Sequence, residues 1–344
     1  MDSEFLVAVR ESIGSPGSFY VGGVLRDLEL GRPIRDIDIV CYEPEKSAHN
    51  LYRRLGKSVF ELSKRYGVWR VVIEGDVTVD FVLIRGSIKE DLFLRDFTVN
   101  AMARDVFTGD IIDPANGLSD LRQGILRAVS EDVFNDDPLR ILRAVRLEDE
   151  LSLSLELRTE MLIREQSSLV VCPAGERVLA ELERLTLLGF LRLGDLGVLA
   201  ELGGTTDRLE RLGHDAPSAV LLVTALGDQL LKLPVSRELA RLTQTLLRVL
   251  PLQAYDARSV HRFRRATEPW SVEALQYLGN AEAIQYILKA RESESDSPLL
   301  RGDELDLPPG PRVGQILELL EEERAVGNIV TRDEALAFVA RYLQ

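Results

Sequence analysis

The segment Phe19–Val40, FYVGGVLRDLELGRPIRDIDIV, contains the pattern that decides the fold of this chain. It predicts a strand, a Gly22-Gly23 turn, a short helix and a second strand that carries two carboxylates. Successive side chains of a strand point to opposite faces. Asp36 and Asp38 therefore share one face, and the isoleucines that alternate with them point into the core.

Paired carboxylates beside a glycine turn indicate a phosphoryl-transfer site. Two neighbouring carboxylates repel each other unless a cation intervenes, and oxygen ligands suit Mg²⁺, which keeps positions for water and phosphate. A Gly-Gly turn leaves no side chain between backbone N–H groups and a triphosphate. The alternative is a solvated strand face and an ordinary turn, which such residues form more often when they occur alone. A P-loop is excluded, because Leu51 stands where a loop ending in Gly56-Lys57-Ser58 needs its first glycine.

Composition favours a folded, α-rich protein. The 344 residues suffice for two or three domains, and 45% of them are hydrophobic. The net charge of −14 counts against nucleic acid as a partner unless positive charge is concentrated locally. Two local concentrations are predicted, one made by Arg140, Arg143 and Arg146 and the other by Arg262, Arg264 and Arg265 near His261.

The chain shows no pattern of a secreted, zinc-binding or membrane protein. Two cysteines cannot form a disulfide framework, and the three histidines lack the spacing of zinc ligands. The start, MDSEFLVAVRES, has no cationic region before an apolar core, and no apolar run approaches about 20 residues. These features predict a cytoplasmic protein with no membrane segment.

Three further elements complete the predicted sheet region. Pro44–Leu55 is typical of a helix with proline in its first turn. Val68–Gly75 and Val77–Ile84 predict a hairpin that turns at Gly75-Asp76. Asp80 lies in its second strand, where it is either a third metal ligand or proton acceptor, or an ordinary exposed aspartate.

The opening segment resembles the head of the class II tRNA nucleotidyltransferases and bacterial poly(A) polymerases. The resemblance continues, in order, through DLFLRDFTVNAMARD (Asp91–Asp105), GDIIDPANGLSDL (Gly109–Leu121), NDDPLRILRAVRL (Asn135–Leu147), AGERVLAELERL (Ala174–Leu185) and LPPGPRVGQIL (Leu307–Leu317). It implies an α+β protein with a polymerase-beta-like head, built on a mixed β-sheet, and an all-α neck, body and tail. The implied segments are residues 1–128 (catalytic head), 129–190 (neck, base recognition), 191–292 (body) and 293–344 (tail, tRNA binding).

The resemblance also implies roles for individual residues. Asp36 and Asp38 would bind Mg²⁺ and act in catalysis together with Asp80. The incoming nucleotide would be bound by Gly22, Gly23, Arg26, Arg95, Asp96, Asn100, Asp137, Arg140, Arg143 and Arg146. Arg95 and Asp96 correspond to the part of the family motif Arg-Arg-Asp that recognises ribose, whereas Leu94 stands in place of its first arginine.

Base recognition is implied for the family motif Glu-Asp-x-x-Arg, which stands here as Asp136-Asp137-Pro138-Leu139-Arg140. A carboxylate accepts from the exocyclic amine of cytosine or adenine, while a guanidinium donates to the ring acceptors. G and U would leave buried groups unpaired and are rejected. The sequence further predicts that Asn135 or Asp136 caps the helix. Glu176 and Arg177 match the family's neck motif, which implies that they buttress Arg140, and the alternative for Glu176 is a capping role at its own helix.

The resemblance implies transfer of nucleotides from CTP or ATP to the tRNA 3′ end and acceptor arm. Only residues 81–90 connect the Asp80 strand to the Asp91 block, so the longer basic loop of CCA-adding members is missing, as in CC-adding members. We therefore expect addition of two C residues. Complete CCA addition, A-addition and poly(A) synthesis stay open, as does a tRNA-end binding protein with a weakened active site.

Overall fold

The computed structural model describes residues 3–14, 16–64, 67–73, 77–84, 86–293, 297–308 and 310–343. The chain forms two compact units, one made of Met1–Glu181 and Asp195–Glu201 and the other of Leu182–Gly194 and Leu202–Gln344. The predicted turn at Gly75-Asp76 lies outside the described residues. The finer division into head, neck, body and tail stays a prediction.

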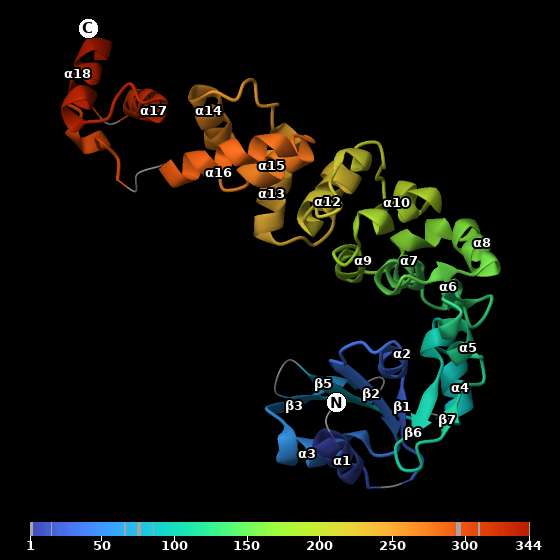
Figure 1. Ribbon diagram of the computed structural model, residues 1–344. Coiled ribbons are helices and arrows are strands. Elements are labelled where there is room, and N and C mark those ends of the chain that lie inside the picture. Colours follow the sequence, from blue (N-terminus) through green and yellow to red (C-terminus); the bar gives the residue numbers. More distant parts are fainter. Residues whose placement is uncertain are drawn as a thin grey trace. The chain divides into compact units, whose positions relative to one another are not determined.

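A seven-stranded mixed sheet forms the centre of the first unit, as the sequence predicts (Figure 1). The strand order is β3-β4-β5-β2-β1-β6-β7, in which β2 and β5 pair in parallel and all other neighbours pair antiparallel. The predicted hairpin is confirmed as β4 and β5. The strands are β1 Phe19–Val21, β2 Asp36–Cys41, β3 Ser58–Ser63, β4 Val68–Val72, β5 Thr78–Leu83, β6 Ala103–Asp105 and β7 Ile111–Ile112.

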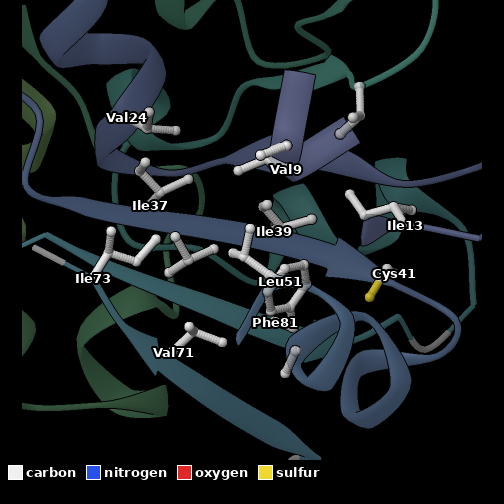
Figure 2. Close-up of a cluster of buried hydrophobic side chains, with 14 residues drawn as sticks. Val9, Ile13, Val24, Ile37, Ile39, Cys41, Leu51, Val71, Ile73 and Phe81 are labelled. Atoms are coloured by element: carbon white, nitrogen blue, oxygen red, sulfur yellow. The ribbon is translucent and has the colours of Figure 1, made fainter. Parts of the chain in front are cut away.

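The two faces of β2 have different surroundings. Ile37 and Ile39 are almost fully buried and pack with side chains of α1 and α3 (Figure 2). On the opposite face, Asp36 is exposed and Asp38 is partly exposed, and only Val40 enters a second hydrophobic cluster. The predicted alternation is therefore confirmed, and it presents both carboxylates on one face.

Helices surround the sheet and continue the chain beyond it. Helix α3 begins at Pro44, as predicted. The helices of the first unit are α1 Ser3–Ser12, α2 Gly23–Glu29, α3 Pro44–Leu55, α4 Ile88–Phe93, η2 Thr98–Asn100, α5 Gly117–Arg122, α6 Val133–Asp136, α7 Arg140–Leu151, α8 Leu157–Glu165, η3 Ser167–Val171, α9 Gly175–Leu182 and α11 Val198–Glu201. A small parallel pair, β8 Ile125–Leu126 with β9 Ser154–Leu155, is the only strand pairing described beyond the main sheet, and β9 lies in the segment expected to be all helical.

The regular elements described in the second unit are all helices, joined by non-helical connections. Its elements are α10 Leu187–Asp195, η4 Leu209–Arg211, α12 Ser218–Leu226, η5 Gly227–Lys232, α13 Arg237–Arg248, α14 Ala257–Thr267, α15 Ser271–Tyr277, η6 Ala281–Ala283, α16 Ile284–Ser293, η7 Gly302–Glu304, α17 Pro311–Val326 and α18 Arg332–Leu343. Across the described ranges, no single helix has the length and apolar character needed to cross a membrane. One pair, Ser218–Lys232 with Arg237–Arg248, meets these limits only when taken together across a 116° bend.

The basic patch predicted near His261 is wrong as a surface of free positive charge. Arg262 binds the nearly buried Glu322 of α17 at 2.8 Å, and Arg264 binds Glu268 at 2.9 Å. Arg265 lies 4.0 Å from Glu318. Each arginine thus has a carboxylate nearby: Arg264 pairs with a residue four positions on, whereas Arg262 and Arg265 meet residues of α17 that the local sequence pattern does not reveal.

Helix α5 packs against η2, which carries the predicted site residue Asn100. The carboxylate of Asp113 accepts the N–H groups of Gly117 and Leu118 at the start of this helix, at 2.7 and 2.9 Å. A Cβ at Gly117 would lie 1.9 Å from the carbonyl oxygen of Thr98 in η2. Only glycine permits this approach of α5 to η2.

We expect Gly117→Ala to destabilise the first unit by about 3 kcal/mol or more, because the added methyl group meets backbone that must shift. Urea unfolding followed by circular dichroism measures the change. Gly14→Ala is the control, since its Cβ would find only side-chain atoms 3.8 Å away. Equal stability of the two variants would contradict the packing of α5 on η2.

Candidate active site

A row of charged side chains crosses three neighbouring strands. Asp38 of β2 is in register with Asp80 of β5, and Asp80 is in register with Arg70 of β4. The Nε and Nη2 atoms of Arg70 each donate to a different oxygen of Asp80, both at 2.7 Å. The hydroxyl of Thr78 donates to Asp36 at 2.8 Å. The sheet therefore brings the three predicted catalytic aspartates together on adjacent strands.

Asp38 is a carboxylate in need of compensating positive charge. Burial raises its pKa to about 6; Arg95 opposes this rise, while Asp80 and Asp36 add to it. A cation beside Asp38 would stabilise the ionised form. Among the described residues, no group of three or more His, Cys, Asp or Glu side chains is arranged to hold a metal ion. The oxygen donors of Asp36 and Asp38 fit Mg²⁺, which needs few protein ligands and fills its other positions with water and phosphate.

The predicted glycine turn approaches this carboxylate closely. Gly22 has φ 74°, in the left-handed region that favours glycine. A Cβ at this position would lie 3.0 Å from Nη1 of Arg95 and 3.3 Å from Oδ2 of Asp38. No side chain caps the following helix α2, which begins at Gly23. The turn thus leaves backbone N–H groups uncovered next to Asp38.

Arg95 lies between two carboxylates at this position. Its Nη2 binds Asp91 at 3.0 Å, and its charge lowers the pKa of Asp38. In the part of the chain that the structure describes, its Nε is one of the few buried polar side-chain atoms without a hydrogen-bond partner. The Nε–H group of Arg95 is therefore a buried donor without a hydrogen bond beside the predicted metal ligands.

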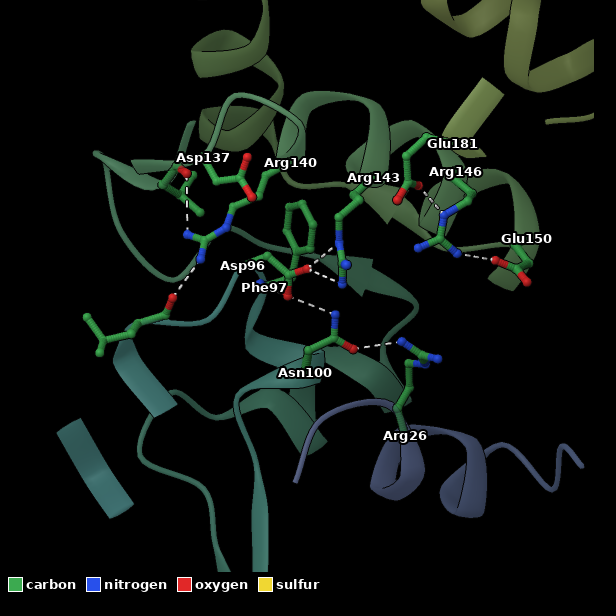
Figure 3. A network of polar contacts seen from close by, with 12 residues as sticks. Arg26, Asp96, Phe97, Asn100, Asp137, Arg140, Arg143, Arg146, Glu150 and Glu181 are labelled. Carbon is green, nitrogen blue, oxygen red and sulfur yellow. Dashed lines mark hydrogen bonds and ion pairs between the residues drawn. The ribbon is translucent and has the colours of Figure 1, made fainter. Parts of the chain in front are cut away.

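Asp96 is the centre of a network that joins α2, η2 and α7 (Figure 3). One carboxylate oxygen accepts from the Phe97 N–H at 2.8 Å and from the Asn100 amide at 2.9 Å. The other accepts from Nε and Nη2 of Arg143 at 2.9 and 2.8 Å. Asn100 in turn accepts from Arg26 at 2.7 Å. Four predicted nucleotide-binding residues are thus mutually bonded, and Asp96 is engaged at both oxygens.

The network keeps Asp96 ionised although it is buried. Burial alone would raise its pKa, but Arg143, the Asn100 amide and the Phe97 N–H hold this pKa below the ordinary value. A guanidinium and several N–H donors that stabilise the charged form outweigh the loss of hydration. The predicted contact of Asp96 with ribose stays a prediction.

The base-recognition residues Asp137 and Arg140 both have partners in the protein. One oxygen of Asp137 accepts from Arg177 at 2.8 Å and the other accepts from the Leu139 N–H at 3.2 Å. Nη2 of Arg140 donates to the carbonyl of Leu94 at 2.7 Å. Arg177 therefore supports Asp137, not Arg140 as the sequence predicts.

The predicted helix cap is also wrong. Asn135 and Asp136 lie in the short helix α6, and α7 begins only at Arg140. Asp137 ends α6 in extended conformation, and its carboxylate meets the N–H of Leu139 at the start of the next helix. The break between the two helices is what turns the Asp137 side chain toward Arg177.

Arg146 differs from the other arginines of α7. Its side chain is 7% exposed and binds Glu181 and Glu150, each at 2.5 Å (Figure 3). Its guanidinium joins α7 to α9 and faces carboxylates of the protein. Its predicted role in nucleotide binding finds no support in this geometry.

Neither Arg70 nor the partner of Arg177 is predicted by the sequence. The register of the β4–β5 hairpin places Arg70 opposite Asp80, so counting back from the turn was the signal that could have found it. No local signal points to the pairing of Arg177 with Asp137, because the two residues lie 40 positions apart.

Comparison with known proteins agrees with this geometry. A sequence profile described as "Poly A polymerase head domain" matches residues 75–127. A CC-adding tRNA nucleotidyltransferase from Geobacter sulfurreducens is 30% identical, with 98% of this chain and 94% of that protein covered. An A-adding tRNA nucleotidyltransferase from Deinococcus radiodurans is 32% identical, with 96% of each covered. The solved Thermotoga maritima CCA-adding enzyme complexed with tRNA shares the fold, with a TM-score of 0.80 at 24% identity over 100% of this chain and 97% of that one.

The polymerase-beta-like sheet, with paired carboxylates beside a glycine turn, defines a nucleotidyltransferase. The identity to curated relatives over nearly the whole length makes the assignment specific. The chain belongs to the family of tRNA nucleotidyltransferases and bacterial poly(A) polymerases. The predicted family, fold class and enzyme class are confirmed.

The ionised Asp96 should make stability depend on pH. Its folded pKa lies below the unfolded value of about 3.9, so the carboxylate stabilises the fold above that value, and this contribution is lost as pH falls through the folded pKa. We expect Asp96→Asn to lower the free energy of unfolding by about 2 to 3 kcal/mol near neutral pH. In urea unfolding, the difference from the wild type should begin to narrow below about pH 3.9 and should continue to narrow as pH falls toward the folded pKa.

Asp91→Asn is the matched control for this prediction. Asp91 binds Arg95 at 3.0 Å with both side chains partly exposed, and the loss of such a pair costs under about 1 kcal/mol. A pH-independent effect of Asp96→Asn, or an equal effect of both substitutions near neutral pH, would contradict the role given to Asp96.

Proposed function

We propose that this protein adds two cytidine nucleotides from CTP to the 3′ end of tRNA, without a nucleic-acid template, and releases pyrophosphate. The observation that carries the proposal is the close approach of Asp38 and Arg95 to Gly22. A Cβ added at Gly22 would lie 3.3 Å from Oδ2 of Asp38 and 3.0 Å from Nη1 of Arg95. A carboxylate for a cation, open backbone N–H groups and a guanidinium are the groups that a nucleoside triphosphate requires.

Asp36 and Asp38 would hold Mg²⁺ at this site. When bound, the ion supplies charge neutralisation for the triphosphate and a lower pKa for the attacking 3′-hydroxyl. Gly22 and Gly23 bind phosphate through the main chain, and the guanidinium of Arg95, whose Nη1 lies next to Gly22, supplies positive charge there. Arg26, Asn100 and Asp96 hold this segment in place through the network.

Base selection rests on Asp137 and Arg140. The Asp137 carboxylate accepts from an exocyclic amine, and Arg140 donates to ring acceptors, which suits cytosine and adenine but not guanine or uracil. Arg177 and the Leu139 N–H fix the carboxylate, while the Leu94 carbonyl fixes the guanidinium. Two groups held in this way read the base edge with little loss of side-chain entropy on binding.

Restriction to CTP is supported by the connection after β5. Strand β5 ends at Leu83 and α4 begins at Ile88, with a capping box between Ser87 and Glu90. Nothing the length of the basic loop of CCA-adding members fits between them. The CC-adding relative and the A-adding relative are 30% and 32% identical to this chain, so the support for CTP comes from this short connection and not from identity.

The tail supplies a means for an acidic protein to bind RNA. Helix α17 begins at Pro311 without a side-chain cap, and a Cβ at Gly314 would meet no atom within 4 Å. Backbone N–H groups at such a helix start attract phosphate, and the open surface at Gly314 permits a nucleic-acid backbone to approach.

Nucleotide incorporation on one tRNA transcript tests the proposal. The transcript is prepared in three forms that lack CCA, CA or A, and each is incubated with Mg²⁺ and labelled CTP or ATP, singly and together. We expect two C residues on the first form, one on the second and none from ATP on the third. Addition through the final A, or a long ladder of A, would contradict CC specificity, and no product from any form would contradict the enzymatic role.

Gly22→Ala tests the phosphate-binding turn. Alanine at this position would have to adopt the left-handed backbone conformation, which costs about 1 to 2 kcal/mol. Its methyl group would also press on Arg95 and Asp38. We therefore expect kcat/KM for CTP to fall by about tenfold or more. Gly31→Ala is the control, because Gly31 has φ 65° and an added Cβ would meet no atom within 4 Å, so this variant has the backbone strain without the contacts to Arg95 and Asp38. Equal losses in both variants would argue against a special role for Gly22.

A further inference from the structure

Asp80 sits beside the proposed cation site but is engaged by a different positive charge. Both of its oxygens receive a hydrogen bond from Arg70 at 2.7 Å, in the two-pronged geometry of an arginine–carboxylate pair. The Asp80 residue is 8% exposed. Its carboxylate is thus already neutralised before any ion binds.

The pair is fixed by the sheet. Arg70 and Asp80 lie directly opposite each other on the antiparallel strands β4 and β5, where side chains in register are neighbours. Asp80 is in turn in register with Asp38 on the parallel strand β2. Arg70, Asp80 and Asp38 therefore form one row, in which the guanidinium and the cation site lie on opposite sides of Asp80.

A cation and Arg70 would compete for the same carboxylate. Binding of Asp80 to a divalent ion would bring the ion close to a guanidinium, and like charges repel strongly where burial limits screening.

We propose that Arg70 is a positioning residue that withholds Asp80 from the divalent cation, so that Asp36 and Asp38 alone bind the ion. The inference rests on the proposed function, which assigns a cation to these two carboxylates. The role of the Arg70–Asp80 pair is to place a neutral, rigid neighbour next to Asp38, where a third free carboxylate would add repulsion.

Binding of Mn²⁺ to the full-length protein, without nucleotide or tRNA, tests this inference. Water-proton relaxation measures the affinity of wild type, Arg70→Gln, Asp38→Asn and the double variant Arg70→Gln with Asp80→Asn. The double variant replaces a neutral ion pair by a neutral amide pair of similar size, so the local charge is preserved. Circular dichroism melting checks that each variant is folded.

The double variant should bind Mn²⁺ within about threefold of wild type, because it removes no ligand. Arg70→Gln should bind about fivefold or more tightly, because it frees Asp80. A loss of tenfold or more in the folded double variant would overturn the inference and make Asp80 a ligand. If Asp38→Asn binds Mn²⁺ as wild type does, the proposed cation site itself fails, which is a separate outcome.

Discussion

The alternation of side chains along β2 is the constraint on which the site depends. Ile37 is 1% exposed and Ile39 is fully buried. The burial of each side chain contributes roughly 2 kcal/mol to the stability of the fold. A slip of one residue would move both isoleucines to the site and force Asp36 and Asp38 into the apolar core. An unpaired carboxylate in such a core costs more than an isoleucine contributes. The same pattern therefore sets the strand register and presents the carboxylates.

Arginines balance the buried carboxylates one by one, although the whole chain has a net charge of −14. Arg70 binds Asp80 next to the cation site, whereas Arg143 binds Asp96 and joins α7 to η2. The first pair contributes to the electrostatic field at Asp38, and the second ties α7 to the segment that carries Asp96. Net charge describes long-range attraction and solubility, and it did not predict either pair.

Elements whose signal is local could be predicted from the sequence. The strand with alternating aspartates, the helix that starts at Pro44 and the β4–β5 hairpin depend on periodicity and on the conformational limits of proline. The prediction of a basic patch near His261 was wrong because Glu322, which lies 60 positions further along the chain, binds Arg262. The prediction of the helix cap was wrong because Asp137 ends α6 and separates it from α7. The side chain of Asp137 pairs with Arg177. Both errors arise from tertiary partners that a single sequence does not specify.

Leu94, which departs from the family motif, still takes part in one hydrogen bond of the candidate site through its main chain. Its side chain is 70% exposed, so it contributes little to packing, while its backbone carbonyl accepts from Arg140 at 2.7 Å. Exchange of arginine for leucine at this position removes side-chain donors but not the carbonyl. The orientation of Arg140 is thus set by the course of the main chain at the end of α4. Because this orientation depends on a backbone carbonyl, an exchange of the Leu94 side chain does not remove it.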